Sequence, residues 1–452
     1  MTRRVVAAAA FALAVAAGAT DAGGGTLPPT AAAERIDRYL AGRASAGTFS
    51  GAVLVATGNR IIFERAYGSA NYEDGTPNAT TTLFRIASMT KPLVAAAALV
   101  LASRGRLDLD ASICASVRPC PLGWQPVTLR NLLTFTSGIP DLFSSVAAVP
   151  PSQLPDAVNA AISSTKKETL SLTAPPGTRT EYSNFDYLLL AYAIQRSSRQ
   201  SWLEAVTDLI LTPAGMTSTR YDDALELVRG RARGYIIAGT RIENTKYEDD
   251  GGLSAGGMLS TLGDLYRFVA AYQDARFFPA PMRDLALRAD DAGFGYGWQI
   301  ASFFGRPIQD FTGGTNGFSS NMSYYPQDAT TVIVLSNLEN AGAKGVSCDI
   351  GAIVHGDAPR NELLSFAPVT AAASDIIGTF AGKDGTLRTF ALGTNGLTYH
   401  GSRSSLQSVI RNGTRSYALA DRPDVVFDVA ADGKTVRASS CGSPLFEAAR
   451  VR

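Results

Sequence analysis

The chain has 452 residues, of which 46% are hydrophobic, and this length allows about two or three domains. Its 41 basic and 40 acidic residues leave a net charge of +1, and neither sign gathers in a block. This balance gives no indication of binding to nucleic acid or to an acidic membrane surface. The composition is that of an ordinary globular protein, so its function must be sought in local motifs.

The first residues have the pattern of an export signal. Arg3 and Arg4 precede an uncharged apolar run that ends in small residues at Ala19. A basic start, a short apolar core and a small-x-small ending are typical of a cleavable signal peptide. The run is shorter than the ~20 residues that span a bilayer, which disfavours a stable membrane anchor. The sequence therefore predicts a periplasmic or secreted protein with a signal peptide at 1–22, cleaved near Ala19 or Ala22.

Export permits disulfide bonds, and the chain has four cysteines. They allow three pairings. Cys114 and Cys120 flank a short loop that contains proline and form the simplest pair, which leaves Cys348 with Cys441. Neither of the two histidines lies at ligand spacing from a cysteine, so we expect no metal. No cofactor is expected either.

The hydrophobic pattern predicts these elements in chain order. A helix over 31–41 is followed by a hairpin of 50–56 and 61–64, with its turn at 58–59. Further helices are expected over 89–104, 127–133, 187–195, 261–272 and 343–355. The stretch 295–334 has the alternation of strands. Strands at both ends of a helix-rich middle indicate an α+β layered fold.

The C-terminal part reads as a separate unit. Residues 358–373 have the composition of a linker, and beyond them short alternating segments are separated by Gly, Asn and Asp turns. We therefore predict one domain over 31–357 and a small all-β domain over 374–452. The small domain holds no polar cluster that indicates chemistry, so its expected role is packing, substrate access or assembly.

A candidate nucleophile stands where the apolar helix over 89–104 begins. Ser88 lies at or next to the N-cap, and Lys91 projects from the same face. A serine hydroxyl needs a neighbouring base, and a lysine enclosed by apolar residues loses affinity for its own proton. The positive helix start would also stabilise an oxyanion beside Ser88. The alternative is that Ser88 only caps the helix and that Lys91 is solvated. Two further S-x-x-K matches, at 163–166 and 164–167, lie in a polar stretch and are expected to be of this non-catalytic kind.

Two further motifs follow in order, Tyr182-Ser183-Asn184 and Phe311-Thr312-Gly313-Gly314. Together with Ser88-Met89-Thr90-Lys91, they resemble the three motifs of the serine β-lactamase and penicillin-binding-protein superfamily. The chain is most similar to the class C β-lactamase-related branch, which includes D-amino-acid peptidases and family VIII carboxylesterases, from about residue 50 to 354. The resemblance implies an antiparallel sheet flanked by helices, with an all-helical subdomain and a small C-terminal all-β domain.

The resemblance also implies a role for each motif residue. Ser88 would form an acyl-enzyme, while Lys91 and Tyr182, with lowered pKa values, would move the protons. Asn184 would orient Lys91 and the substrate. The backbone N–H groups of Ser88 and Gly314 would form the oxyanion hole. The other substrate-binding candidates are the remaining residues of the third motif, Phe311, Thr312 and Gly313. Because neither histidine stands in a strong motif, the chemistry also favours Ser–Lys–Tyr over Ser–His–Asp.

Two phenylalanines depart from the family pattern. Relatives usually carry Lys or His at the position of Phe311, where a cation would hold a substrate carboxylate and bias the pKa of the tyrosine. Phenylalanine does neither, and family VIII esterases often have an aromatic residue there. Phe311 therefore favours small acyl esters over β-lactams and D-alanyl peptides, both of which carry a carboxylate. Phe135 stands where many relatives have histidine, and the sequence offers no physical reason for it.

Two competing interpretations remain open. The segment 252–256 matches G-x-S-x-G, the nucleophile elbow of α/β-hydrolases, with Ser254 at its centre. That elbow follows an apolar strand, whereas the residues before this segment are polar and acidic. The second alternative is a non-catalytic relative that binds acyl or peptide ligands, which the intact Ser88, Lys91 and Tyr182 oppose.

The sequence thus predicts an exported serine hydrolase acting on a small molecule. A carboxylesterase on small acyl esters is favoured, and a β-lactamase or D-alanyl/D-amino-acid peptidase is the alternative. The sequence does not define the acyl group, the leaving group or the oligomeric state.

Overall fold

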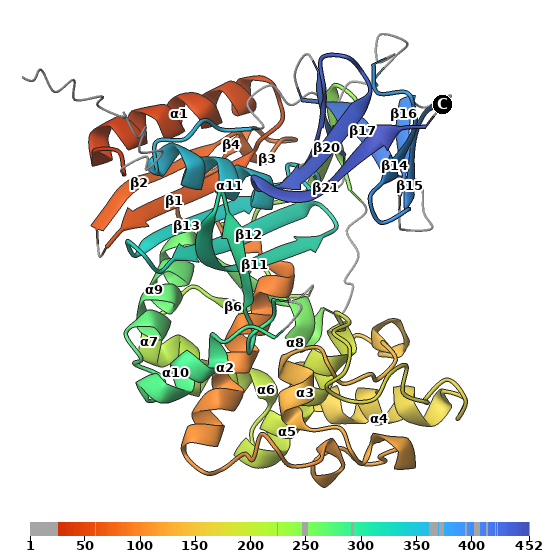
Figure 1. Cartoon of the computed structure of the whole chain (residues 1–452). Coiled ribbons are helices and arrows are strands. Elements are labelled where there is room, and N and C mark those ends of the chain that lie inside the picture. Colours follow the sequence, from red (N-terminus) through yellow and green to blue (C-terminus); the bar gives the residue numbers. More distant parts are fainter. Residues whose placement is uncertain are drawn as a thin grey trace, which may run out of the picture.

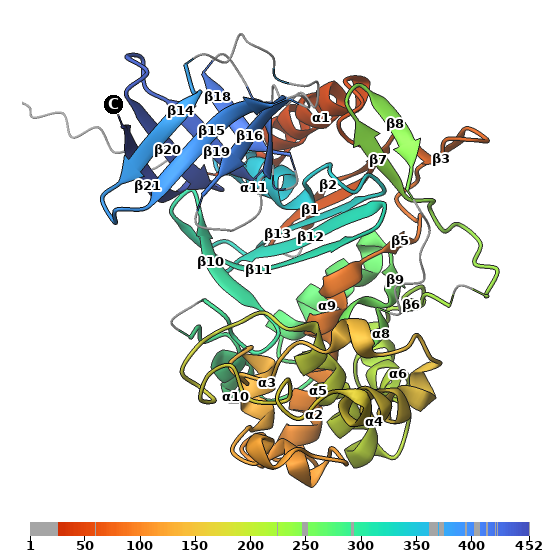
Figure 2. The same cartoon turned by 90° about the vertical axis from the view of Figure 1, so that its right-hand side faces the viewer.

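The computed structural model describes residues 26–58, 60–223, 225–245, 252–290, 293–360, 369, 375–393, 396–401, 407–412, 415–420, 422 and 424–451. The predicted signal peptide lies outside these residues, and so does most of the predicted linker. Within the described ranges, no helix is both long enough and apolar enough to cross a membrane. The chain forms a helix-covered sheet, a helical subdomain below it and a C-terminal barrel beside it (Figures 1 and 2).

The central layer is a six-stranded antiparallel sheet in the order β10-β11-β12-β13-β1-β2. Its strands are β1 (Gly51–Thr57), β2 (Arg60–Tyr67), β10 (Gln299–Phe303), β11 (Arg306–Thr315), β12 (Phe318–Tyr325) and β13 (Thr330–Ser336). The predicted hairpin β1–β2 joins the later strands because β1 pairs with β13, with Val53 opposite Val334. Both strands are buried along almost their whole length. Helices α1 (Pro29–Ser45) and α11 (Ala343–Val354) cover one face of the sheet (Figure 1).

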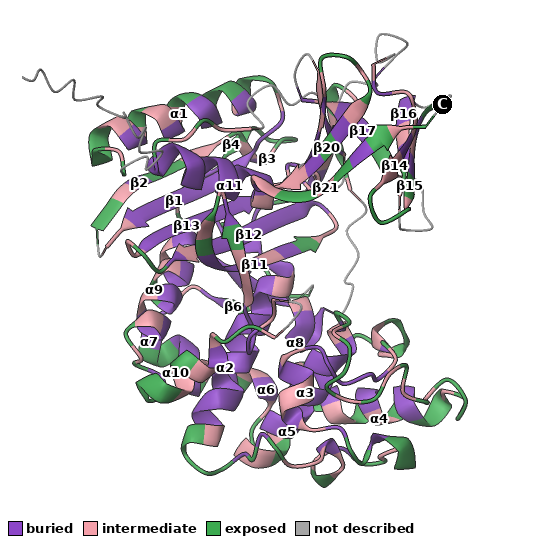
Figure 3. Cartoon of the chain, viewed as in Figure 1, coloured by how far each residue is buried: buried purple, intermediate pink, exposed green. Residues whose placement is uncertain are grey.

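The other face of the sheet packs on the helical part of the chain. Its helices are α2 (Thr90–Ser103), α3 (Leu129–Leu133), α4 (Leu154–Ser164), α5 (Asn184–Ser198), α6 (Trp202–Val206), α7 (Thr212–Ala214), α8 (Leu253–Gly256), α9 (Leu262–Gln273) and α10 (Ala280–Ala286). Helix α2 is buried from Thr90 to Leu101 (Figure 3). It is apolar all round because α5, α6 and α8 pack against it on different sides.

Three small sheets connect these layers. They pair β3 (Ser69–Asn71) with β4 (Thr76–Pro77), β9 (Met258–Ser260) with both β5 (Phe84–Arg85) and β6 (Arg220–Tyr221), and β7 (Tyr235–Ala238) with β8 (Arg241–Asn244). The sheet β5-β9-β6 positions the candidate nucleophile, because β5 ends at Arg85 and the next N–H, that of Ile86, donates to the carbonyl of Met258 at 3.0 Å.

The C-terminal domain is a closed antiparallel barrel. Its strands are β14 (Gly378–Gly382), β15 (Leu387–Gly393), β16 (Gly396–His400), β17 (Gln407–Arg411), β18 (Ser416–Leu419), β19 (Val425–Val429), β20 (Thr435–Ser440) and β21 (Ser443–Arg450). The barrel closes because β14 pairs with β21, with Phe380 opposite Arg450. Its interior is filled by aromatic rings, among which Phe390 packs on Phe427 with centroids 5.1 Å apart.

The cysteines are joined in the pairing that the sequence favours. Cys114 bonds to Cys120 within the helical part. Cys348 on α11 bonds to Cys441, which follows β20. The second bond ties the barrel to the helix that covers the central sheet.

Candidate active site

Ser88 lies in a sharp turn between β5 and α2. It is the middle residue of a single 3₁₀ turn, Ala87–Met89, and α2 begins directly after it at Thr90. Ala87 has a left-handed backbone with φ 46°, which strains a residue that carries a Cβ atom. The turn half-buries Ser88 at the start of the helix, one residue before the N-cap Met89.

Lys91 is completely buried, with 0% of its surface exposed, and its amine meets three oxygen atoms. Nζ lies 3.1 Å from Ser88 Oγ, 2.7 Å from Asn184 Oδ1 and 2.7 Å from the carbonyl oxygen of Ala255. Burial disfavours the charged form and lowers the pKa of Lys91 from 10.5 to about 7, although the carboxylate of Asp141 acts in the opposite direction. A large fraction of this amine is therefore neutral near pH 7.

Tyr182 approaches Ser88 from another side. Its hydroxyl donates to Ser88 Oγ at 2.8 Å, although 44% of the residue is exposed. The lowered pKa expected for Tyr182 is wrong: desolvation of its hydroxyl and the charge of Asp141 raise the pKa above its ordinary value, against the opposing hydrogen bond to Ser88. The physical reason is that burial of the hydroxyl disfavours the charged phenolate. Tyr182 thus keeps its proton.

Phe135 holds the ring of Tyr182 in place. Its ring centroid lies 4.7 Å from that of Tyr182 and 5.2 Å from that of Tyr187. Phe135 has φ 57°, and its carbonyl accepts from the N–H of Glu181 at 2.8 Å, next to Tyr182. Lys91 Nζ also lies close to this ring, 4.9 Å from the Tyr182 centroid. Sequence reasoning had no account of Phe135, because its contacts come from segments far apart in the chain.

Asn184 is the first residue of α5, which brings its side chain to Lys91. Ser183 caps this helix by accepting from the N–H of Asp186 at 3.1 Å. The carboxylate of Asp141 also accepts from the N–H groups of Asn184 and Phe185, each at 3.1 Å. Sequence reasoning missed Asp141; an acidic residue just after the turn at 136–140 was the available signal. A carboxylate at a helix N-terminus is stabilised there by the exposed N–H groups.

The third motif lies on β11, against the turn that carries Ser88. A Cβ atom on Gly313 would lie 2.1 Å from the carbonyl oxygen of Ile86, so only glycine allows this approach. A Cβ atom on Gly314 would meet open space, and this residue is exposed. Strand β11 thus runs directly beside the nucleophile turn, and the oxyanion role of the Ser88 and Gly314 N–H groups stays a prediction.

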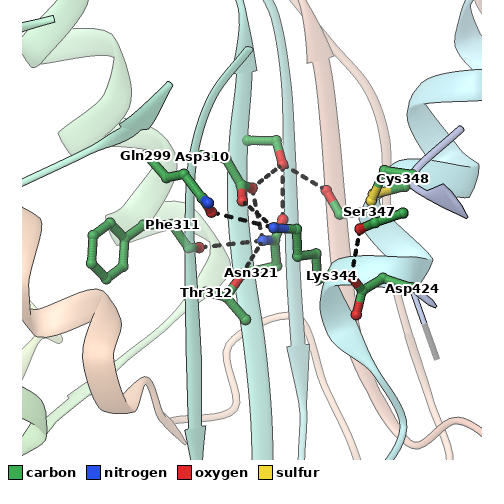
Figure 4. Close-up of polar contacts among 12 residues, drawn as sticks. Gln299, Asp310, Phe311, Thr312, Asn321, Lys344, Ser347, Cys348 and Asp424 are labelled. Carbon is green, nitrogen blue, oxygen red and sulfur yellow. Dashed lines mark hydrogen bonds and ion pairs between the residues drawn. A yellow bond between two sulfur atoms is a disulfide. The ribbon is translucent and has the colours of Figure 1, made fainter. Parts of the chain in front are cut away.

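The structure corrects the expected role of Phe311. Phe311 is only 4% exposed and belongs to the hydrophobic core between the sheet and the helices. Alternate residues of a strand share a face, so Phe311 lies on the face that Gly313 presents to Ile86. Figure 4 shows its ring directed away from Asp310, Asn321 and Lys344. Phe311 therefore contributes packing, whereas Thr312 is half-exposed and its hydroxyl lies beside Asn321 on the opposite face of β11.

The alternative nucleophile does not have the environment of an elbow serine. Ser254 is 0% exposed on the short α8, and its hydroxyl donates to the carbonyl of Tyr187 at 3.1 Å. A serine of this kind also needs a histidine as its base. The ring of His355 contacts other groups: it lies 2.6 Å from the carbonyl oxygen of Gly351 and 2.9 Å from Asp328. In the part of the chain that the structure describes, no His, Cys, Asp or Glu group is arranged to hold a metal ion.

The fold and this site define a serine hydrolase of the β-lactamase and penicillin-binding-protein type. A family model described as Beta-lactamase matches residues 33–353, and the chain belongs to that family. It is 32% identical to penicillin-binding protein 4* of Bacillus subtilis (strain 168) over 312 residues, which cover 64% of this chain and 68% of that protein.

Two solved structures share the fold. An octameric penicillin-binding protein homologue from Pyrococcus abyssi superposes with a TM-score of 0.66 at 20% identity, over 92% of this chain and 99% of that one. A D-amino acid amidase from Ochrobactrum anthropi SV3 has a TM-score of 0.61 at 22% identity, over 72% of this chain and 97% of that one.

Proposed function

We propose that this protein hydrolyses small acyl esters through an acyl-enzyme on Ser88, with Lys91 as the general base. The observation that carries the proposal is the completely buried amine of Lys91, 3.1 Å from Ser88 Oγ. This distance is short enough for direct proton transfer, and a pKa of about 7 matches a base that works near neutral pH.

The partners of Lys91 support the direction of that transfer. A neutral amine has two hydrogens and one lone pair. The oxygens of Asn184 and Ala255 are acceptors only, and each lies 2.7 Å from Nζ, so the two hydrogens point to them. The lone pair is then left facing Ser88, where it accepts the hydroxyl proton as Oγ attacks the carbonyl carbon. Asn184 therefore orients the base.

Tyr182 serves as a neutral donor in this scheme. Its hydroxyl donates to Ser88 Oγ and stays protonated during attack. After the tetrahedral intermediate forms, the Lys91 ammonium returns its proton to the leaving alkoxide. Water then attacks the carbonyl carbon of the acyl-enzyme while Lys91 takes a proton from it. Lys91 returns this proton to Ser88 Oγ as the bond to the acyl group breaks, which releases the acid and restores Ser88.

The third motif supports esters as the substrate class. With Phe311 in the core, the motif itself offers no cation to a carboxylate beside the scissile bond. β-Lactams and D-alanyl peptides carry such a carboxylate, whereas simple esters do not. Hydrolysis of a β-lactam or D-amino-acid peptide is the second candidate, favoured by the names of the similar proteins.

One preparation can separate these candidates. Turnover of p-nitrophenyl acetate, nitrocefin and a D-alanyl peptide should be compared for the native chain and for Ser88→Ala. We expect the ester to be preferred and its hydrolysis to be lost in Ser88→Ala. A fluorophosphonate should also label Ser88, as read by mass spectrometry. Absence of labelling and turnover would support a non-catalytic binding protein, and preference for the carboxylate-bearing substrates would overturn the ester assignment.

We also propose that the chain is exported. The signal-like pattern at 1–22 and the disulfide-bonded cysteines both support an oxidising compartment. N-terminal sequencing of the protein from a periplasmic or culture fraction should find cleavage after Ala19 or Ala22. An intact N-terminus in the cytoplasmic fraction would contradict export.

A further inference from the structure

A buried polar cluster lies behind the third motif, and one of its residues reaches three consecutive positions of β11. Asn321, on the neighbouring strand β12, is 0% exposed. Its Nδ2 lies 2.8 Å from Asp310 Oδ1, 3.3 Å from the carbonyl oxygen of Phe311 and 3.0 Å from Thr312 Oγ1 (Figure 4). The Asn321 amide thus contacts β11 at the start of the third motif and stabilises the strand there.

The network fixes which way the Asn321 amide points. The carbonyl oxygen of Phe311 can only accept, so the group that faces it must be the NH₂. On its other side, Asn321 Oδ1 accepts from the hydroxyl of Ser323 at 2.8 Å. A flipped amide would bring its oxygen against the Phe311 carbonyl and leave both groups unsatisfied in a buried site. The NH₂ group has two hydrogens for three acceptors, so one hydrogen is shared, and Thr312 Oγ1 can only accept from this group.

This donation determines what the Thr312 hydroxyl can do. A hydroxyl has one hydrogen and two lone pairs, and the Asn321 N–H occupies a lone pair. Among the described residues, Thr312 Oγ1 takes part in this hydrogen bond alone, so its own hydrogen has no protein acceptor. Thr312 is half-exposed and lies two positions before the exposed Gly314 on the strand beside Ser88.

We propose that Asn321 is a positioning residue that holds Thr312 as a hydrogen-bond donor to an oxygen atom of the bound substrate. Asn321 itself does not touch the substrate and acts through Thr312. The inference rests on the proposed function, because it assigns Thr312 to the substrate site of Ser88. It adds the requirement that the substrate present an acceptor oxygen to β11, as esters and amides do.

The rest of the cluster keeps Asn321 rigid. Asp310 Oδ1 accepts from Asn321 and lies 2.8 Å from Ser323 Oγ, whose single hydrogen is shared between Asp310 and Asn321. The amine of Lys344 lies 3.6 Å from Asp310 Oδ2. Ser323 Oγ also lies 2.9 Å from Ser347 Oγ on α11. Buried hydrogen bonds that are linked in this way fix side-chain orientation more firmly than one isolated bond.

A double-mutant cycle tests the proposal. We expect Asn321→Ala and Thr312→Val each to lower kcat/KM for p-nitrophenyl acetate by about 5- to 10-fold, the effect of one lost hydrogen bond. If Asn321 acts through Thr312, Asn321→Ala should have no further effect in the Thr312→Val background. It should keep its full effect in a Thr312→Ser background, which retains the hydroxyl. If Asn321→Ala does not fold, Asn321→Leu, of similar volume, takes its place.

Ser347→Ala is the matched control. It removes a buried hydroxyl of the same cluster, 2.9 Å from Ser323 Oγ, that forms no hydrogen bond to Asn321 or Thr312. We expect it to lower the melting temperature like Asn321→Ala but to change kcat/KM less than about 2-fold. The proposal is overturned if Asn321→Ala lowers kcat/KM equally in the Thr312→Val background, or no more than Ser347→Ala does. The proposed function is tested separately by the loss of turnover in Ser88→Ala. A failure of the Asn321 proposal can therefore be told apart from a failure of the proposed function.

Discussion

The pH dependence of acylation tests the buried amine directly. With the pKa of Lys91 at about 7, about half of the amine is neutral at pH 7 and about a tenth at pH 6. Only the neutral form can accept the Ser88 proton, so activity should fall as pH falls. We expect kcat/KM for p-nitrophenyl acetate to rise about tenfold per pH unit below pH 7 and to level off above about pH 8.

A single substitution should move this profile in a defined direction. The carboxylate of Asp141 favours the ammonium form and raises the pKa of Lys91. Asp141→Asn removes that charge but keeps an oxygen that can cap α5, so the midpoint should shift to lower pH. Asp37→Asn is the control, because Asp37 lies on α1, across the sheet from the helical part, and pairs with Arg65.

The measurement is the rate of the acylation burst between about pH 5 and pH 10, normalised to the amount of Ser88 that a fluorophosphonate titrates. A midpoint above about pH 9 would show an ordinary solvated lysine and refute the assignment of the base. A shift to higher pH in Asp141→Asn, or an equal shift in Asp37→Asn, would refute the electrostatic reasoning.

Three further predictions concern stability and the competing serine. The effect of Lys91→Met on the free energy of unfolding should be up to about 4 kcal/mol more favourable at pH 7 than at pH 10, because the unfolded state binds more protons than the folded state between about pH 7 and pH 10. Urea unfolding should show this difference, and an effect independent of pH would contradict it. Gly313→Ala should cost about 1–3 kcal/mol and most of the esterase activity, since its Cβ would meet Ile86. Gly314→Ala is the control and should keep the melting temperature of the native chain, because its Cβ would meet open space. Equal melting temperatures for Gly313→Ala and Gly314→Ala would contradict the close approach of Gly313 to Ile86. Ser254→Ala should keep its esterase activity and lose only about 1 kcal/mol of stability, by urea unfolding. If Ser254→Ala lost esterase turnover while a fluorophosphonate still labelled Ser88, Ser254 would again be a candidate nucleophile.

Local patterns predicted the elements that carry the site. The hairpin turn and the apolar run after Ser88 are short-range signals, and β1, β2 and α2 begin and end within a few residues of their predicted limits. The motif order also predicted the fold. The pairing of β1 with β13 joins residues about 280 positions apart, which no local pattern specifies.

The remaining properties depend on tertiary surroundings. Whether Phe311 is exposed beside Ser88 or buried in the core is decided by the register of β11 against the Ser88 turn. The raised pKa of Tyr182 depends on the desolvation of its hydroxyl in the folded chain and on the position of Asp141. The left-handed backbone of Phe135 is tolerated because three aromatic rings surround its side chain. None of these relations is visible as a spacing in the sequence.

The bond between Cys348 and Cys441 has a consequence for how the chain can be cut. It closes a covalent ring across a sequence separation of 93 residues, which contains the junction between the two domains and most of the barrel strands. A protease that nicks the chain once inside this ring would leave two polypeptides still joined through sulfur. Electrophoresis without reductant should then show one band of full mass, and dithiothreitol should split it in two. The barrel would stay covalently attached to α11 through the Cys348–Cys441 bond even after the peptide chain between the two domains is cut.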